Sequence, residues 1–440
     1  MRYEAIQGPD WLTRSAIYQI NPRTFSAEGT IAAATRRLPE LKELGFGVMY
    51  LCPVFEEDTS EDRTFWSERQ KKYQTENPKN PYRMNDYFRI DSEYGTLEDL
   101  QAFIQESHRL GLKVLLDLVY VHMGPNAPIL QRHPEFVQRD KHGNLICGEW
   151  HFPYLDFNCP GLREYLWCNM TWYIGWMDAD GFRCDCGDLE PIDFWEEGRR
   201  RMKAIKPDSV LINEGRDGNS LVRAYDSIYS FDWHERLYEV ITGKRPASIL
   251  PVSWQTWEDQ FPAGSMALRD LDNHDTVTDW PERAEVAAGH DGMELVQVLN
   301  YMINGIPMVY CGNEVADTCR INMFANRFHM GSYEVTDWTQ GETPAGQRRQ
   351  ALYRKLNAMK RESDVLRYGE TQWLEHDQPD TVLVFRRSWQ GKTITFAANV
   401  GTEPVTVSLR LPGSECLSSG AVRREDSVLL QPKGYIVTEA

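Results

Sequence analysis

The pentapeptide Gly181-Phe182-Arg183-Cys184-Asp185 has the composition of a short buried strand that ends in two opposite charges. Arg183 and Asp185 are two residues apart, so on an extended strand their side chains point to the same face. A carboxylate beside a guanidinium stays ionised at neutral pH, and this is the state that a nucleophile needs. Because such a pair alone is usually a structural ion pair, its meaning depends on the strands around it.

The chain contains eight strand-like segments, and most of them are followed by a helix-like segment. In chain order they are residues 16–25, 46–54, 113–121, 181–186, 209–214, 227–233, 267–273 and 306–311. Several are near-continuous runs of Val, Ile and Leu, as expected for parallel strands that are buried on both faces. Amphipathic patterns predict helices at 97–110, 194–205 and 294–303, and Thr96 with Asp99 marks the start of the first. Eight alternations over about 340 residues predict an α/β fold, a (β/α)8 TIM barrel.

Two segments depart from this alternation. Residues 122–160 show no convincing helix but many aromatic and polar residues, and a long loop after a barrel strand commonly forms a wall of the active site. After about Val365, alternating strands at 372–375, 381–389, 392–399, 405–411 and 427–438 predict a small antiparallel β-sandwich. We therefore expect a barrel from 1–121 and 161–364, a loop subdomain at 122–160, and a C-terminal β-sandwich domain at 365–440.

The charge balance restricts the class of partner. There are 48 basic and 65 acidic residues, which gives a formal net charge of −17. This charge disfavours binding to nucleic acids and to anionic membrane surfaces, so we expect a neutral small-molecule substrate. The longest apolar-rich stretch, residues 45–55, is too short to span a bilayer. The sequence gives no prediction of the oligomeric state.

The N-terminal sequence and the cysteines indicate a cytoplasmic protein. The first residues show no apolar run after a basic segment, so we expect no signal peptide. The nine cysteines have no spacing typical of a metal knuckle, and a chain of this size does not need a disulfide framework. Reduced thiols in the cytoplasm are the expectation.

Polar residues gather where the predicted strands end. The third strand ends in Asp117 and His122, and the fourth in Arg183 and Asp185. The fifth ends in Asn213 and Glu214, and the seventh in Asn273, His274 and Asp275. In such barrels the active site lies at the carboxyl ends of the strands and draws its groups from several of them. Paired carboxylates can cleave a glycosidic bond, because one attacks the anomeric carbon while its protonated partner donates to the leaving oxygen.

With these motifs in this order, the chain resembles the α-amylase family, glycoside hydrolase family 13, of the α-glucosidase or oligosaccharide-hydrolase type. The resemblance also extends to residues 81–87, 90–96 and 305–314. It implies that Asp185 is the nucleophile and Glu214 the general acid/base. Asp275 would be the third catalytic acid, which holds sugar hydroxyls near the transition state. A retaining double displacement implies a carboxyl separation of about 5–5.5 Å.

The resemblance also assigns residues that bind substrate or support the site. Arg183 would keep Asp185 anionic, and Asp117 would brace the site from beneath. His122 and His274 would hydrogen-bond sugar hydroxyls. Tyr82 would form a stacking platform for the sugar ring.

Each of these residues taken singly also has a structural interpretation. His122 and His274 could be satisfied structural histidines, and Tyr82 could be a loop aromatic that packs on the core. Such interpretations do not explain why all the motifs occur together in this order. In the long loop, Trp150, His151 and Tyr154 are equally compatible with sugar contacts and with loop packing.

Three departures from the family pattern bear on metals and on the mode of cleavage. Many family members have a calcium-binding Asn before the first-motif histidine, where this chain has Val121. Residues 22–29, where others carry a carboxylate-rich metal loop, contain a single acid. Gly187-Asp188 replaces the Lys-His pair that follows the nucleophile in typical endo-amylases. We therefore expect no metal, no cofactor, and an exo-type preference for short substrates.

The function predicted from the sequence is a retaining glycosidase that hydrolyses α-glucosidic bonds in short oligosaccharides, of maltodextrin or isomalto type. A transglycosylase or a sugar isomerase of the same family is one alternative. A non-catalytic carbohydrate-binding relative is an alternative of another class, and a metal-dependent barrel hydrolase is a third. Both the linkage and the choice between endo and exo cleavage stay open at this point.

Overall fold

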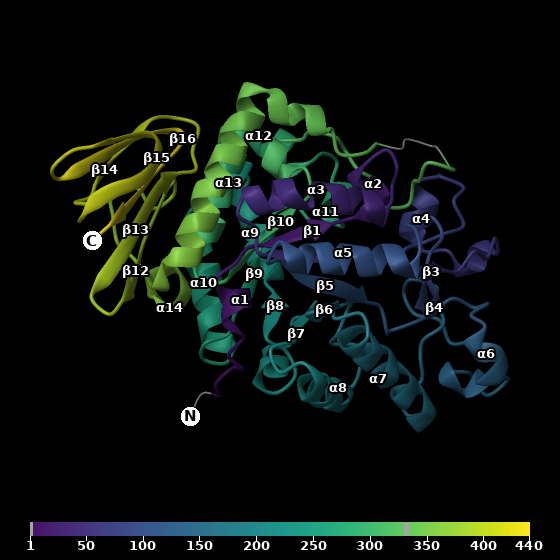
Figure 1. The fold of residues 1–440 in the computed structure, drawn as a ribbon. Coiled ribbons are helices and arrows are strands. Elements are labelled where there is room, and N and C mark those ends of the chain that lie inside the picture. The colour runs from purple at the N-terminus through teal and green to yellow at the C-terminus, as the bar shows by residue number, and fades with distance from the viewer. Residues whose placement is uncertain (1–2, 330–333) are drawn as a thin grey trace.

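A closed barrel of eight parallel strands forms the larger part of the protein, and an antiparallel sheet lies beside it (Figure 1). The computed structural model describes residues 3–329 and 334–440. The barrel strands are β1 (Ile17–Ile20), β2 (Val48–Leu51), β5 (Lys113–Leu118), β6 (Gly181–Cys184), β7 (Val210–Asn213), β8 (Ser227–Tyr229), β9 (Ala267–Arg269) and β10 (Ile306–Tyr310). Their order around the barrel is β1-β10-β9-β8-β7-β6-β5-β2. The predicted barrel is confirmed, and each strand is shorter than its predicted range.

Burial explains why these segments are strands. Apart from Lys113, every residue of the eight barrel strands is buried, as expected when helices cover the outside and side chains fill the inside. The register places Asp117 of β5 beside Arg183 of β6, and Arg183 beside Ile212 of β7. These pairings bring the polar ends of the three strands to the same rim of the barrel.

Helices cover the outside of the barrel. The longer ones are α3 (Ile31–Glu43), α5 (Leu97–Arg109), α7 (Pro160–Gly175), α8 (Ile192–Ile205), α9 (Phe231–Ile241), α10 (Ile249–Gln260), α12 (Ala284–Met302) and α13 (Pro344–Glu362). The shorter ones are α1 (Asp10–Thr13), α2 (Pro22–Phe25), α4 (Glu68–Lys72), α6 (Ile129–Arg132), α11 (Thr276–Asp279) and α14 (Asp364–Tyr368). Helix α5 begins with the predicted capping box of Thr96 and Asp99.

The connection between β7 and β8 differs from the others. It contains only a five-residue 3-10 helix, η3 (Gly218–Val222), where the other barrel strands are followed by an α-helix. The chain therefore adds no α-helix to the outer layer between β7 and β8. Helix α10, which follows α9 in the next connection, packs its Phe261 end against Gly218 of η3.

The long loop after β5 is partly helical, so the expectation of no helix there was wrong over a short stretch. Helix α6 spans four residues, and a 3-10 helix, η2 (Pro134–Phe136), follows it. Isolated bridges join His122 to Tyr154 and Val137 to Leu155, so the loop folds back on itself. In the loop after β2, strands β3 (Phe55–Glu57) and β4 (Met84–Ile90) form a separate two-stranded sheet.

The C-terminal strands form the predicted antiparallel domain. They are β11 (Glu370–Trp373), β12 (Val382–Trp389), β13 (Lys392–Asn399), β14 (Val405–Ser408), β15 (Ser414–Arg423) and β16 (Ser427–Glu439). Hydrogen bonds join them into one sheet, in which β16 pairs with β13, β14 and β15. Val382 and Val384 of β12 share a buried core with Val407 of β14 and Val428 of β16. Among the described residues, no helix combines the length and the apolar character that crossing a bilayer requires.

Candidate active site

A pocket of about 650 Å³ opens where the barrel strands end. Its lining includes six of the residues predicted from sequence, namely Tyr82, His122, Asp185, Glu214, His274 and Asp275. Asp185 follows β6 directly and Glu214 follows β7 directly. Parallel strands that end at the same rim therefore place these acids around one cavity.

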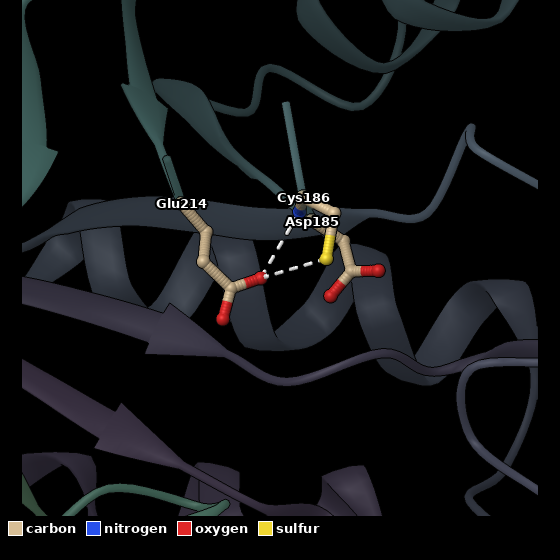
Figure 2. Close-up of side chains that lie close together, drawn as sticks. All are labelled: Asp185, Cys186 and Glu214. Atoms are coloured by element: carbon tan, nitrogen blue, oxygen red, sulfur yellow. Dashed lines mark hydrogen bonds between the residues drawn. The ribbon is translucent and has the colours of Figure 1, made fainter. Parts of the chain in front are cut away.

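Asp185 and Glu214 lie face to face. A carboxylate oxygen of Asp185, the sulfur of Cys186 and a carboxylate oxygen of Glu214 all lie within 4.8 Å of one another. Figure 2 shows the three side chains extending to the same side of the strand ends. The Cys186 N–H donates to Oε2 of Glu214 at 3.0 Å, and the Cys186 thiol contacts the same oxygen at 3.6 Å. The backbone after the first acid therefore orients the second.

Arg183 contacts three acids beneath the pocket. Its Nη1 lies 2.7 Å from Asp185 and 2.8 Å from Asp117, and its Nη2 lies 2.7 Å from Glu214. The Tyr50 hydroxyl donates to the second oxygen of Asp117. Since Arg183 is only 1 % exposed, its charge acts on the acids with little screening by water. The structure thus brings Arg183 and Asp117 together with the two facing acids.

The two facing acids have separated pKa values. Burial raises the pKa of Asp185 to about 6 and that of Glu214 to about 8, while Arg183 opposes the shift in both. The negative charges of Asp185 and Asp275 also raise the pKa of Glu214. Near pH 7, Asp185 is therefore mainly ionised and Glu214 mainly protonated.

Asp275 stays ionised for a different reason. Burial raises its pKa, but positive charges outweigh burial and hold the pKa well below its usual range: His274, which is charged only below its own pKa of about 4, and the permanently charged Arg69. Arg69 of α4 lies 2.9 Å from both Asp275 and Asp279. No sequence motif marks Arg69, because it lies on the short helix α4, far along the chain from the acid that it contacts.

The two pocket histidines are buried and neutral. Burial lowers the pKa of His122 to about 3 and that of His274 to about 4. Gln19 donates from Nε2 to Nδ1 of His274 at 2.8 Å, which assigns the ring proton of His274 to Nε2. The Tyr82 ring stacks on the His274 ring, with centroids 5.6 Å apart and planes 20° apart. The stacked rings of Tyr82 and His274 therefore form part of one wall of the pocket.

Trp150, His151 and Tyr154 of the long loop were each compatible with a sugar contact or with loop packing. Of these three, only Trp150 lines the pocket. His151 lies 3.5 Å from Glu68 of α4, and the ring of Tyr154 packs over Gly148. Further lining residues that the sequence analysis did not name are Ser67, Arg69, Asn80, Phe152, Asp279 and Phe324. Most of them come from loops outside the strand-end motifs, where neither a motif nor a periodic pattern marks them.

The cluster of Asp185, Cys186 and Glu214 has the spacing of a metal-binding group, but its chemistry does not fit one. Burial raises the pKa of the Cys186 thiol far above its usual range, so it stays protonated, whereas a metal ligand must be a thiolate. Arg183 already contacts both carboxylates at 2.7 Å. A metal cation bound to the same carboxylates would be repelled by the nearby positive charge of Arg183.

Comparison with known proteins gives a consistent result. The profile of the alpha amylase catalytic domain matches residues 12–146. A cyclomaltodextrinase from Thermoanaerobacter pseudethanolicus is 22% identical, over 98% of this chain and 78% of that protein. Neopullulanase 2 from Thermoactinomyces vulgaris is 23% identical, over 97% of this chain and 77% of its own length. The crystal structure of an alpha-amylase from Lactobacillus plantarum superposes with a TM-score of 0.81 at 22% identity, over 98% of this chain and 100% of that one.

Proposed function

We propose that this chain is a member of the α-amylase family, glycoside hydrolase family 13, and a retaining glycosidase that hydrolyses α-glucosidic bonds in short oligosaccharides. The observation that carries this proposal is the approach of Asp185 and Glu214 to within 4.8 Å. Retaining enzymes hold their two carboxyl groups about 5–5.5 Å apart, whereas inverting enzymes need about 6.5–9.5 Å to admit a water molecule.

The proposed reaction has two displacements. Ionised Asp185 attacks the anomeric carbon while Glu214 donates its proton to the leaving oxygen, so that the glycosidic bond breaks and an ester to Asp185 forms. Glu214, now a carboxylate, then takes a proton from water as the water oxygen attacks the same carbon and releases Asp185. Two inversions at one carbon retain the α configuration in the product.

The surrounding residues have supporting roles in this proposal. Arg183 holds Asp185 and Asp117 in place and favours their ionised forms. Neutral His122 can donate and accept hydrogen bonds, which suits the hydroxyls of an uncharged sugar. His274, whose Nδ1 accepts from Gln19, can donate from Nε2. Asp275 accepts hydrogen bonds from the sugar. Tyr82, stacked on His274, offers an aromatic face to the ring.

Short maltodextrin or isomalto-type chains are the proposed substrates. The pocket of about 650 Å³ has Trp150 and Phe152 on its lining, and Arg69 joins α4 to Asp275 and Asp279 across it. A pocket lined by these aromatic and charged side chains suits a short oligosaccharide. Relatives named cyclomaltodextrinase and neopullulanase support the same class of substrate.

We place the protein in the cytoplasm. All nine cysteines are free, and Cys147 and Cys168 are exposed. Exposed thiols are stable in a reducing compartment.

Two measurements test the proposal. Asp185→Ala and Glu214→Gln should each reduce kcat on maltotriose by at least about 10²–10⁴-fold, with an unchanged melting temperature. Exposed Glu235 provides the control Glu235→Gln, which should keep full activity. NMR of the first product should show the α anomer before mutarotation. Near-normal rates in either active-site variant, or a β product, would refute the mechanism, and transfer products in place of glucose would indicate a transglycosylase.

A further inference from the structure

The loops that follow β6 and β7 approach each other closely beside the catalytic pocket. A Cβ atom on Gly215 would lie 2.3 Å from Oδ1 of Asp188. A Cβ atom on Gly187 would lie 2.5 Å from Oδ1 of Asn213. A side chain at either position would displace the residue that it meets, so the two glycines permit the contact between the loops.

Asp188 joins the loop after β6 to the backbone on both sides of Glu214. Its Oδ1 accepts a hydrogen bond from the side-chain amide of Asn213 at 2.8 Å. Its Oδ2 accepts from the backbone N–H of Arg216 and, at 2.9 Å, from that of Asp217. Hydrogen bonds to a carboxylate are roughly twice as strong as those between neutral groups. One carboxylate therefore fixes the residue before Glu214 and the second and third residues after it.

The segment 183–188 also contacts Glu214 itself. Nη2 of Arg183 lies 2.7 Å from Oε2 of Glu214, and the N–H of Cys186 donates to the same oxygen at 3.0 Å. The backbone N–H of Glu214 donates to the Cys184 carbonyl at 3.0 Å. This segment thus holds Glu214 both by its backbone and by its carboxyl group.

We propose that Asp188 is a positioning residue for the general acid/base, which keeps the carboxyl group of Glu214 within reach of the leaving oxygen. The inference rests on the proposed function for the role of Glu214. A general acid must lie within hydrogen-bond distance of the atom that it protonates, and a displacement of about 1 Å can cost about 10²-fold in rate. Asp188 is not on the lining of the catalytic pocket, so it acts through Glu214 and not on the sugar.

The position of Asp188 at the surface limits what its removal should change. Asp188, Arg216 and Asp217 are all exposed. Water can therefore replace the carboxylate as the partner of the two N–H groups, and the barrel should stay folded without it. Asp185 keeps its contact with Arg183 at 2.7 Å, which does not involve Asp188. The expected effect is thus confined to the step that needs a proton from Glu214.

Two substrates with different leaving groups test this inference. The leaving sugar of maltotriose needs a proton from Glu214, whereas the fluoride of α-glucosyl fluoride needs none. Asp188→Ala should therefore lower kcat/KM for maltotriose by about 10–100-fold and leave the first-turnover release of fluoride unchanged. Unchanged release of fluoride also shows that the pocket and the nucleophile are intact. Asp188→Asn keeps one carbonyl oxygen as a neutral acceptor, so its loss on maltotriose should be smaller.

The matched control is Asp217→Ala on the neighbouring loop. It removes an exposed carboxylate that accepts the N–H of Asn219 at the start of η3, so the ratio of the two rates should stay as in the wild type. Equal losses on both substrates in Asp188→Ala, or no loss on either, would overturn the inference. If Asp188→Ala does not fold, Asp188→Asn, which keeps the side-chain volume, is judged by the same two outcomes. Hydrolysis of maltotriose by the wild-type enzyme is measured in parallel, because absence of hydrolysis would overturn the proposed function itself.

Discussion

The pH dependence of hydrolysis tests the division of labour between Asp185 and Glu214. Asp185 must be ionised to attack, so activity rises as the pH passes upward through its pKa of about 6. Glu214 must be protonated to assist the leaving group, so activity falls as the pH passes upward through its pKa of about 8. The structure therefore predicts a bell-shaped profile of kcat/KM with its maximum near pH 7.

The size of the effect follows from the same two pKa values. The fraction of enzyme with Asp185 ionised and Glu214 protonated is about 83% at pH 7, and about 9% at both pH 5 and pH 9. We therefore expect kcat/KM to fall about ninefold on either side of the optimum. Because the two groups interact, the measured midpoints belong to the pair.

The assay measures kcat/KM for maltotriose from pH 4 to 10 at constant ionic strength. The Glu214→Gln variant tests whether the fall in activity at high pH, the alkaline limb of the profile, comes from Glu214. With α-glucosyl fluoride, whose leaving group needs no proton, the first-turnover release of fluoride by this variant should keep the acid limb and lose the alkaline one. If the alkaline limb persists in Glu214→Gln, another group titrates there and the reasoning is wrong.

Three further predictions concern metals, cleavage mode and stability. Exhaustive chelation should leave activity and melting temperature unchanged, because Arg183 already contacts the carboxylates of Asp185 and Glu214, where a cation would bind. A fall in activity or in melting temperature that added calcium restores would contradict this prediction. Maltotriose should be cleaved faster than soluble starch, since the typical endo-amylase Lys-His pair is replaced by Gly187-Asp188 and Trp150 of the long loop lines the pocket. Faster starch cleavage with mid-length products would refute this. Asp180→Asn should lower the free energy of unfolding by about 3–5 kcal/mol at pH 7, because buried Asp180 contacts Lys113 at 2.8 Å. Burial raises the pKa of Asp180, but hydrogen bonds from its basic neighbours outweigh burial and hold this pKa below its usual range. The stabilisation from Asp180 is therefore fully present above the pKa of the unfolded state. It is lost as the pH falls through the lower pKa of the folded state. Urea unfolding at pH 7 and pH 3 should show the smaller difference at pH 3.

The order of the strands and the acids at their ends were predictable because both leave local marks in the sequence. A strand buried on both faces needs a nearly continuous apolar run, and Val210-Leu211-Ile212 before Glu214 is such a run, while the strand before Asp185 is marked by the Arg183–Asp185 pair. The capping box of Thr96 and Asp99 is equally local, since it depends on residues three apart. Strand β15, by contrast, was missed because most of its residues are exposed or half-buried, so no alternation of apolar and polar residues marks it.

Contacts between distant segments were decided only by the tertiary structure. Nothing near Arg69 in the sequence indicates that it lies 2.9 Å from Asp275. Nor does the sequence around Asp188 reveal that its carboxylate accepts the N–H groups of Arg216 and Asp217. The sequence by itself determined which segments are buried and which chemistry stands at their ends, because periodicity and composition report burial one segment at a time. The separation of the acids, their pKa values and the lining of the pocket depend on packing between segments far apart in the chain, and no local pattern encodes that packing.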